Sequence, residues 1–145
     1  DSGADLLVYG MGEKAVVEIA EALEAGIPIE EITFIRGTVY RTKDKDRPYE
    51  PIFLPSFKEV AASKKKFAES FKIQYENTDS KSAGTLVEQY DTVYVVQNPP
   101  MEPLSDRELD DIYDLDYMMD YHPMYKDSGV PALNEVKFSI TSTRG

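Results

Sequence analysis

The fold class is decided by one stretch near the start of the chain, Asp5-Leu6-Leu7-Val8-Tyr9-Gly10-Met11-Gly12-Glu13. Its first five residues are mostly apolar, which indicates a short buried strand. The glycines break that strand, and apolar residues on one broad face predict a helix from about Glu13 to Ala25. Gly26 favours the end of this helix, and Pro28 prevents its continuation. The stretch therefore predicts a strand, a turn and a helix in succession.

A second strand is predicted from Ile32 to Arg41, so residues 5–41 follow the order strand, helix, strand. This order is typical of a βαβ unit, whose two strands normally run parallel. The first strand is apolar on both faces, which favours a sheet with helices on both sides. We therefore expect an α/β fold with an incomplete βαβ unit, and further α/β structure upstream of Asp1 in a longer parent protein.

The middle of the chain predicts one helix and one hairpin. Residues 42–55 are polar and contain three prolines, which indicates a loop. Ser56-x-x-Glu59 is a capping box, and helical spacing after it predicts a helix of about twenty residues with its aromatic side chains directed inward. Thr85–Tyr90 and Thr92–Gln97 are rich in β-branched and aromatic residues, which predicts a β-hairpin.

The last third of the chain predicts short elements. A second capping box, Ser105-x-x-Glu108, indicates a helix through about Tyr113. A further helical turn is predicted at Asp116–Tyr121. Residues Val136–Thr141 alternate in polarity, which predicts a final strand.

The charge of the chain is negative overall and unevenly distributed. A net charge of −11 over 145 residues argues against nucleic-acid binding, because phosphate contacts need clustered Lys and Arg. Residues 36–72 nevertheless carry ten basic and five acidic residues, a net +5, while residues 98–135 carry two basic and ten acidic ones, a net −8. These regions are interpreted as solvated faces, or alternatively as surfaces that attract each other or dock on the rest of a parent protein.

Self-contained catalytic or metal chemistry is poorly supported. The chain has no Cys, and His122 is its single His, which we interpret as a hydrogen-bonded structural residue. The carboxylates between residues 106 and 120 lack the ligand spacing of a calcium loop, so a solvated helix face is the better interpretation. No apolar run approaches the length of a membrane span. We predict no catalytic residue and no metal ligand.

Gly10-x-Gly12 lies where backbone N–H groups of a strand-to-helix turn could meet a phosphate. The third glycine of the dinucleotide fingerprint is missing, and Glu13 in the first helical turn would repel phosphate. Gly10, Gly12 and Glu13 are therefore candidate cofactor-binding residues, with simple tight-turn geometry as the alternative interpretation.

Two stretches carry a family resemblance. Residues 4–13, with the following helix and the strand predicted over Ile32–Tyr40, resemble the closing βαβ of the cobalamin-domain-like module that precedes many radical SAM cores. Residues 135–145 look like the first barrel strand of a radical SAM domain, in which Arg-Gly is followed by a Cys-x3-Cys-x2-Cys loop. Over nearly its whole length, the chain is similar to the N-terminal region of the YgiQ-like family of uncharacterised radical SAM proteins.

The resemblance implies a cytoplasmic parent protein that binds a [4Fe-4S] cluster and S-adenosylmethionine, with the cluster ligands outside this chain. It implies three parts: an α/β accessory part at 1–41, a connecting region at 42–134, and the truncated first barrel strand at 135–145. We expect a non-catalytic fragment that covers or gates the radical site, with the rest of its own parent chain as partner. The alternatives are a nucleotide- or corrinoid-binding α/β module and an acidic protein-interaction domain.

Overall fold

The computed structural model describes residues 3–140, and the chain divides into two compact units, 1–103 and 104–145, each described by itself below. The elements of the first unit are β1 (Leu6–Val8), α1 (Glu13–Glu24), η1 (Ile29–Glu31), β2 (Thr38–Thr42), β3 (Ile52–Phe53), α2 (Phe57–Ala62), α3 (Lys64–Glu76), β4 (Leu86–Tyr90) and β5 (Val93–Gln97). The elements of the second unit are α4 (Asp106–Tyr113), η2 (Pro123–Tyr125) and α5 (Ala132–Val136). None of the helices within residues 3–140 is long and apolar enough to cross a membrane.

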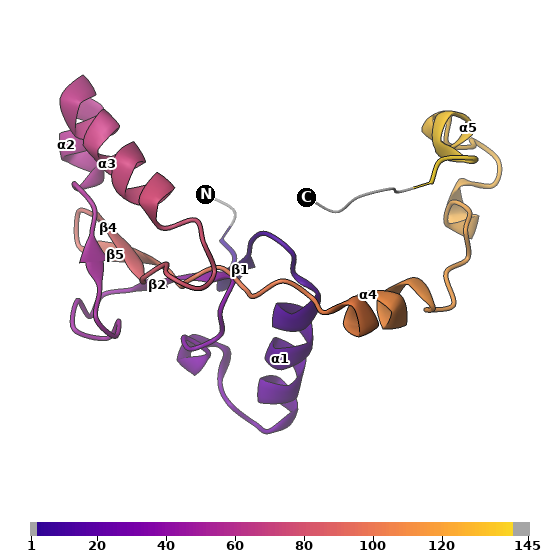
Figure 1. The fold of residues 1–145 in the computed structure, drawn as a ribbon, viewed down its shortest axis with the longest axis horizontal. Coiled ribbons are helices and arrows are strands. Elements are labelled where there is room, and N and C mark those ends of the chain that lie inside the picture. Colours follow the sequence, from indigo (N-terminus) through magenta and orange to yellow (C-terminus); the bar gives the residue numbers. More distant parts are fainter. Residues whose placement is uncertain (1–2, 141–145) are drawn as a thin grey trace. The chain divides into compact units, whose positions relative to one another are not determined.

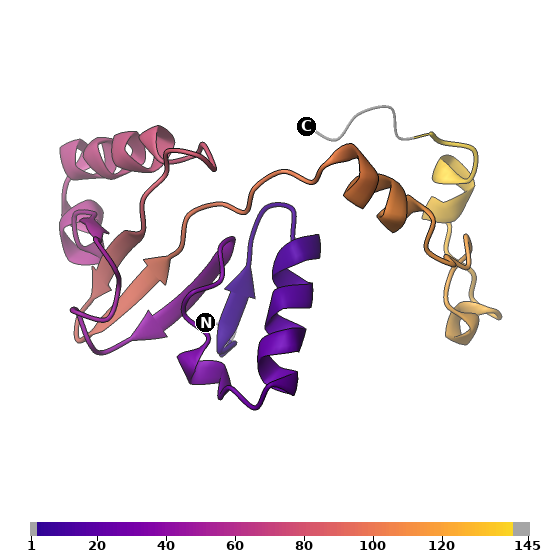
Figure 2. The same ribbon diagram turned by 60° about the horizontal axis from the view of Figure 1, so that its bottom comes forward.

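The first unit is built on an open sheet with strand order β1-β2-β5-β4-β3 (Figures 1 and 2). All neighbours are antiparallel except β3 and β4, which run parallel. The predicted hairpin is confirmed as β4 and β5, with Tyr90 opposite Val93 and with Asp91 at φ 51° in the turn between them. The sheet thus joins residues from both ends of the unit.

The predicted parallel βαβ unit is wrong, because β1 and β2 pair antiparallel. The helix forms as predicted, but residues 32–36 are not strand. Ile32 and Ile35 instead pack against α1 in a buried cluster. The chain then turns at Gly37, which has φ +70° and donates its N–H to the carbonyl of Pro99 at 2.8 Å. This turn, which favours glycine, sends β2 back along β1 in the opposite direction.

The single long helix predicted after Ser56 is two helices, α2 and α3. The capping box of Ser56 and Glu59 is confirmed. Ser63 interrupts the helix with an extended backbone, φ −145° and ψ 117°, and its side chain accepts a hydrogen bond from the N–H of Lys66. Ser63 therefore acts as a new N-cap, which starts α3 in a new direction. The predicted loop over residues 42–55 also contains the two-residue strand β3.

The register places the two helical layers on opposite faces of the sheet. Leu6, Tyr40 and Val96 share one face, and Leu6 packs against the buried cluster that includes α1. Tyr90 lies on the other face, where its ring stacks on Phe57 of α2 at 4.9 Å. Figure 1 shows α1 on one side of the sheet and α2 with α3 on the other. Each layer covers only one end of its face.

The second unit consists of short helices. The capping box of Ser105 and Glu108 is confirmed at the start of α4. The helical turn predicted at residues 116–121 is absent. The predicted strand is also wrong for residues 136–140, where α5 ends at Val136 and no strand follows, while the prediction for Thr141 lies outside the described residues. A strand needs a hydrogen-bonded neighbour, and none pairs with this segment within residues 3–140.

The domain division at 41/42 and 134/135 concerns the parent protein and stays a prediction. In the first unit, β2 and β5 pair across the first of these boundaries, so that one sheet contains strands from both sides of it.

Candidate functional site

The predicted glycine loop forms a tight turn between β1 and α1. Gly10 has φ +71°, a conformation that favours glycine, and a Cβ at that position would meet no atom within 4 Å. Gly12 is the N-cap of α1, and its carbonyl accepts the N–H of Val16 at 2.9 Å. The adjoining Tyr9 N–H donates to the carbonyl of Gly37 at 2.9 Å, which fixes the loop against the start of β2.

Glu13 stands in the first turn of α1, and its Oε2 atom is buried. A carboxylate there interacts favourably with the helix dipole, and its negative charge would repel a phosphate at the same helix start. The structure thus brings Gly10, Gly12 and Glu13 together at one helix start. Ligand binding by this loop stays a prediction.

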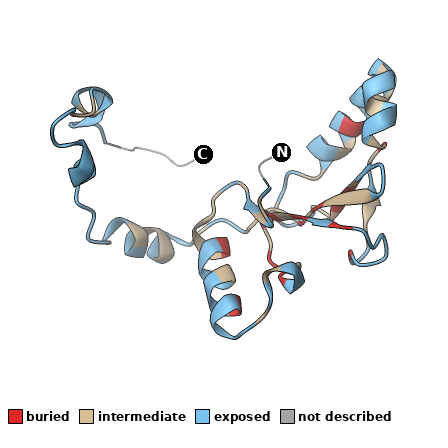
Figure 3. Cartoon of the chain, turned by 180° about the vertical axis from the view of Figure 1, so that it is seen from behind, coloured by how far each residue is buried: buried red, intermediate tan, exposed pale blue. Residues whose placement is uncertain are grey.

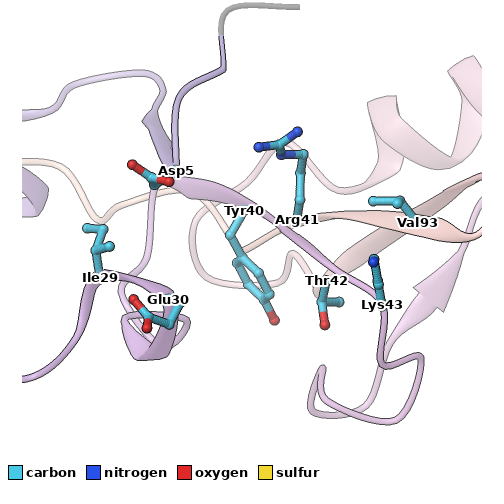
Figure 4. A pocket seen from close by; sticks show the side chains of 8 residues that line it. All are labelled: Asp5, Ile29, Glu30, Tyr40, Arg41, Thr42, Lys43 and Val93. Atoms are coloured by element: carbon cyan, nitrogen blue, oxygen red, sulfur yellow. The ribbon is translucent and has the colours of Figure 1, made fainter.

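A cavity of about 340 Å³ lies beside the middle of β2. Figure 4 shows its lining side chains, which are Asp5, Ile29, Glu30, Tyr40, Arg41, Thr42, Lys43 and Val93. Tyr40 and Arg41 are consecutive strand residues, so their side chains leave β2 in opposite directions (Figure 4). Asp5 and Glu30 lie on one side of the cavity and Arg41 and Lys43 on the other (Figure 4), so the charged groups do not converge on one point, and the described lining has no arrangement suited to proton transfer or nucleophilic attack.

The half-buried Tyr9 and the buried Tyr40 have perturbed acidity. Burial raises the pKa of the Tyr9 hydroxyl, opposed by a hydrogen bond with Gln97 and by the charge of Arg36. Burial also raises the pKa of the Tyr40 hydroxyl, opposed by the charge of Arg47. Both phenols stay protonated donors at neutral pH, and Tyr9 donates to the carbonyl of Asn98 at 2.5 Å. Tyr9 thus serves as a hydrogen-bond donor, and the protonated Tyr40 hydroxyl is available as one.

Metal ligation finds no support in the described part of the chain. Within residues 3–140, no group of three His, Cys, Asp or Glu side chains could hold a metal ion. The chain also has no Cys. The residues present therefore do not fit a [4Fe-4S] cluster, which needs thiolate ligands. The hydrogen bond expected for His122 is present, since its Nδ1 accepts the N–H of Met124 at 3.2 Å.

One half of one sheet face is mostly apolar and uncovered. This open sheet face lies opposite the α1 side and consists of Leu7, Val39, Val93 and Val95, with the exposed Arg41 among them, opposite Val95. Leu7 is 49% exposed, and the three valines are half-buried. A hollow of about 170 Å³ lies over it. The helix α2 packs on β4, and α3 packs on α2, so these helices lie toward the other end of the sheet. An apolar sheet face is normally covered by another layer.

A second uncovered surface runs along α3. Phe67, Phe71 and Tyr75 recur at four-residue spacing and are exposed by 62, 62 and 70%. We call these three side chains the aromatic stripe. Ser70 and Ile73 occupy the inward side of the helix instead, and Ser70 is 4% exposed. The prediction that the aromatics of this helix point inward is therefore wrong, and the signal that could have prevented it is the new N-cap at Ser63.

The fold and these surfaces define a mixed α/β module with an open five-stranded sheet, no assembled active site in its described residues, and apolar faces left uncovered. A family profile described as Radical SAM N-terminal matches residues 1–139. The chain belongs to this family.

Its relatives include uncharacterised proteins of clostridia. It is 51% identical over 146 residues to a UPF0313 protein of Clostridium botulinum, covering 100% of this chain and 23% of that protein. It is 52% identical over 147 residues to a UPF0313 protein of Clostridium perfringens, covering 100% of this chain and 22% of that protein. The chain thus spans about a quarter of the length of the curated relatives it matches. No solved structure matches it.

Proposed function

We propose that the chain is a non-catalytic N-terminal module that covers or gates the radical site of a cytoplasmic radical SAM protein. The observation that carries this proposal is the open sheet face, with its apolar side chains left uncovered by the elements of the first unit. Contiguous exposed apolar surface of this kind marks a site of protein contact. The partner is the rest of the parent chain, since the relatives extend far beyond the matched region.

The family membership implies a parent that holds a [4Fe-4S] cluster and S-adenosylmethionine and generates a radical from the latter. The module itself contributes no thiolate to such a cluster, because it has no Cys. Its contribution is to exclude water from the reaction, as active-site lids do. The proposal extends to a cobalamin-domain-like origin of residues 4–40, although β1 and β2 pair antiparallel here, and to a barrel strand over residues 135–145 that forms when the rest of the parent supplies neighbouring strands.

Iron–sulfur reconstitution tests the proposal. The full-length parent and the 145-residue chain are incubated with iron, sulfide and reductant under anaerobic conditions, and cluster absorbance is recorded. We expect the absorbance of a [4Fe-4S] cluster from the parent and none from the chain. Cluster absorbance from the chain alone would contradict its non-catalytic role.

The gating role is tested by replacing an apolar side chain on the open sheet face. In the parent, Leu7→Asp places a charge on this face, while Lys45→Gln changes an exposed loop side chain outside this face and serves as control. We expect L7D to raise the rate at which S-adenosylmethionine is cleaved without substrate, because water reaches the site. Unchanged rates in L7D, with normal cluster content, would oppose gating through this face.

A further inference from the structure

A second cavity in the first unit is lined by basic side chains, although the chain as a whole is acidic. It measures about 370 Å³ and lies between residues 33–36, the loop at residues 47–49 and the end of β5. Arg36 and Arg47 both line it, and none of the described lining residues is acidic. The chain as a whole carries a net charge of −11, so a cavity with two arginines and no carboxylate differs from its surroundings.

Both guanidinium groups are held by main-chain carbonyls rather than by carboxylates. Arg36 donates from Nε to the carbonyl of Pro100 at 3.1 Å and from Nη2 to the carbonyl of Ser80. Arg47 donates from Nη2 to the carbonyl of Glu30 at 2.7 Å. Among residues 3–140, no carboxylate forms an ion pair with either guanidinium. Neutral acceptors orient both groups and leave their positive charge uncompensated, as an oxyanion site requires.

The cavity also offers flat apolar surfaces and a free hydroxyl donor. Phe34 is 64% exposed and Tyr49 is 82% exposed beside the two arginines, so both rings are available for stacking. The hydroxyl of Tyr40 has no hydrogen-bond partner within the described residues, and the Tyr40 side chain lines this cavity too. The volume falls within the range of about 300–1,000 Å³ typical of small-molecule sites.

We propose that this cavity binds an organic phosphate that carries a planar ring, as a nucleoside monophosphate does. Arg36 and Arg47 bind the phosphate oxygens through charge-assisted hydrogen bonds, and Tyr40 donates a further one. Phe34 and Tyr49 stack on the ring. The site is separate from the Gly10–Gly12 loop, whose residues do not line this cavity, so it stands without the ligand prediction made for that loop.

Calorimetric titration of the full-length parent with AMP tests the proposal, with adenosine and inorganic phosphate as partial ligands and with the 145-residue chain as a second sample. We expect saturable binding of AMP that weakens as salt is raised, and binding of adenosine or phosphate alone that is weaker by about tenfold or more. Absence of AMP binding by the parent, or equal affinity for phosphate and AMP, would overturn the proposal.

Substitutions locate the site. Arg47→Gln and Tyr49→Ala change exposed side chains and leave the core intact, and each should weaken AMP binding by about tenfold. Arg36→Gln should have at least the same effect, with circular dichroism to establish folding. Arg41→Gln is the matched control, because Arg41 is an exposed arginine that does not line this cavity. Unchanged affinity in both R47Q and Y49A, or an equal loss in R41Q, would place AMP elsewhere and overturn the assignment.

Discussion

Both units of the chain start a helix with a capping box, but they differ in how much apolar surface they bury. Every buried hydrophobic residue of the described chain lies in the first unit, including Ile32, Val87 and Val96 at 0% exposure. No described residue from 104 to 140 is buried, and Figure 3 shows that part of the ribbon in the colours of exposed and intermediate residues. Capping residues are thus sufficient to start a helix, but a stably folded unit also needs buried apolar side chains.

The greatest loss of stability is expected when a buried side chain of the first unit is truncated. Ile32→Ala removes a fully buried side chain from the cluster around α1 and should lower the free energy of unfolding by about 2–5 kcal/mol. Ile112→Ala, in α4, removes the same group from a half-buried position and should cost less than about 1 kcal/mol. Urea denaturation followed by circular dichroism measures both. Equal losses would show that the second unit has a core of its own.

The first unit also contains a buried network of hydrogen bonds around Asn98. The side-chain Nδ2 of Asn98 donates to the carbonyls of Thr33 and Ile35 and to the hydroxyl of Thr38, at 2.9–3.0 Å. Asn98→Ala removes these hydrogen bonds, although the Ile35 carbonyl still accepts one from the Thr38 hydroxyl, and the loss should cost about 1–3 kcal/mol. Asn134→Ala in the second unit is the control and should be nearly neutral in the same denaturation experiment. If N98A were neutral as well, water would have to replace the amide.

The two capping boxes allow a matched comparison. Ser56→Ala should lower the stability of the first unit by about 1 kcal/mol, because α2 is tied to the sheet through the stacked rings of Phe57 and Tyr90. Ser105→Ala should reduce the helicity of residues 106–113 without moving the unfolding midpoint of the first unit. Amide chemical shifts and urea denaturation distinguish these outcomes. A shift of the midpoint in S105A would couple the units.

The smallest effect is a pH dependence in the first capping box. Hydrogen bonds from the side chain and backbone of Ser56 lower the pKa of Glu59 below its ordinary value of 4.5. A carboxylate with a lowered pKa stabilises the fold above its unfolded pKa, and this contribution is lost as the pH falls through the folded pKa. NMR titration of Glu59 should show the lowered pKa, and Ser56→Ala should return it toward 4.5. An unchanged pKa in S56A would exclude Ser56 as the cause.

Local patterns predicted the elements that depend on local bonds. The hairpin of β4 and β5, the helix α1 and both capping boxes follow from spacing and residue type within a few positions. The direction of β2 does not, because it depends on the turn at Gly37 and on the packing of Ile32 and Ile35 against α1. An apolar run such as residues 32–36 can form a strand or a core segment, and only its distant partners decide between them.

The candidate site shows the same division. The position of Gly10 and Gly12 in a strand-to-helix turn was predictable from the sequence, because the conformation is local. The cavity lined by Arg36 and Arg47 was not predictable, since folding brings its lining together from segments that are far apart in the sequence, and the basic residues of 36–72 indicated only an excess of positive charge. The outward direction of the aromatic stripe depends on the helix break at Ser63, a single residue within an otherwise helical pattern.

Oxidative footprinting tests most directly whether the uncovered apolar surfaces meet the rest of the parent chain. Hydroxyl-radical oxidation of Leu7 and of Phe67, Phe71 and Tyr75 is compared between the 145-residue chain and the full-length parent, with Tyr40, already 6% exposed, as the unchanged reference. The covering role predicts that Leu7 and the aromatic stripe oxidise several-fold more slowly in the parent, because its remaining domains pack on them. Equal oxidation rates in the two proteins would show that these surfaces stay exposed and would contradict the covering role.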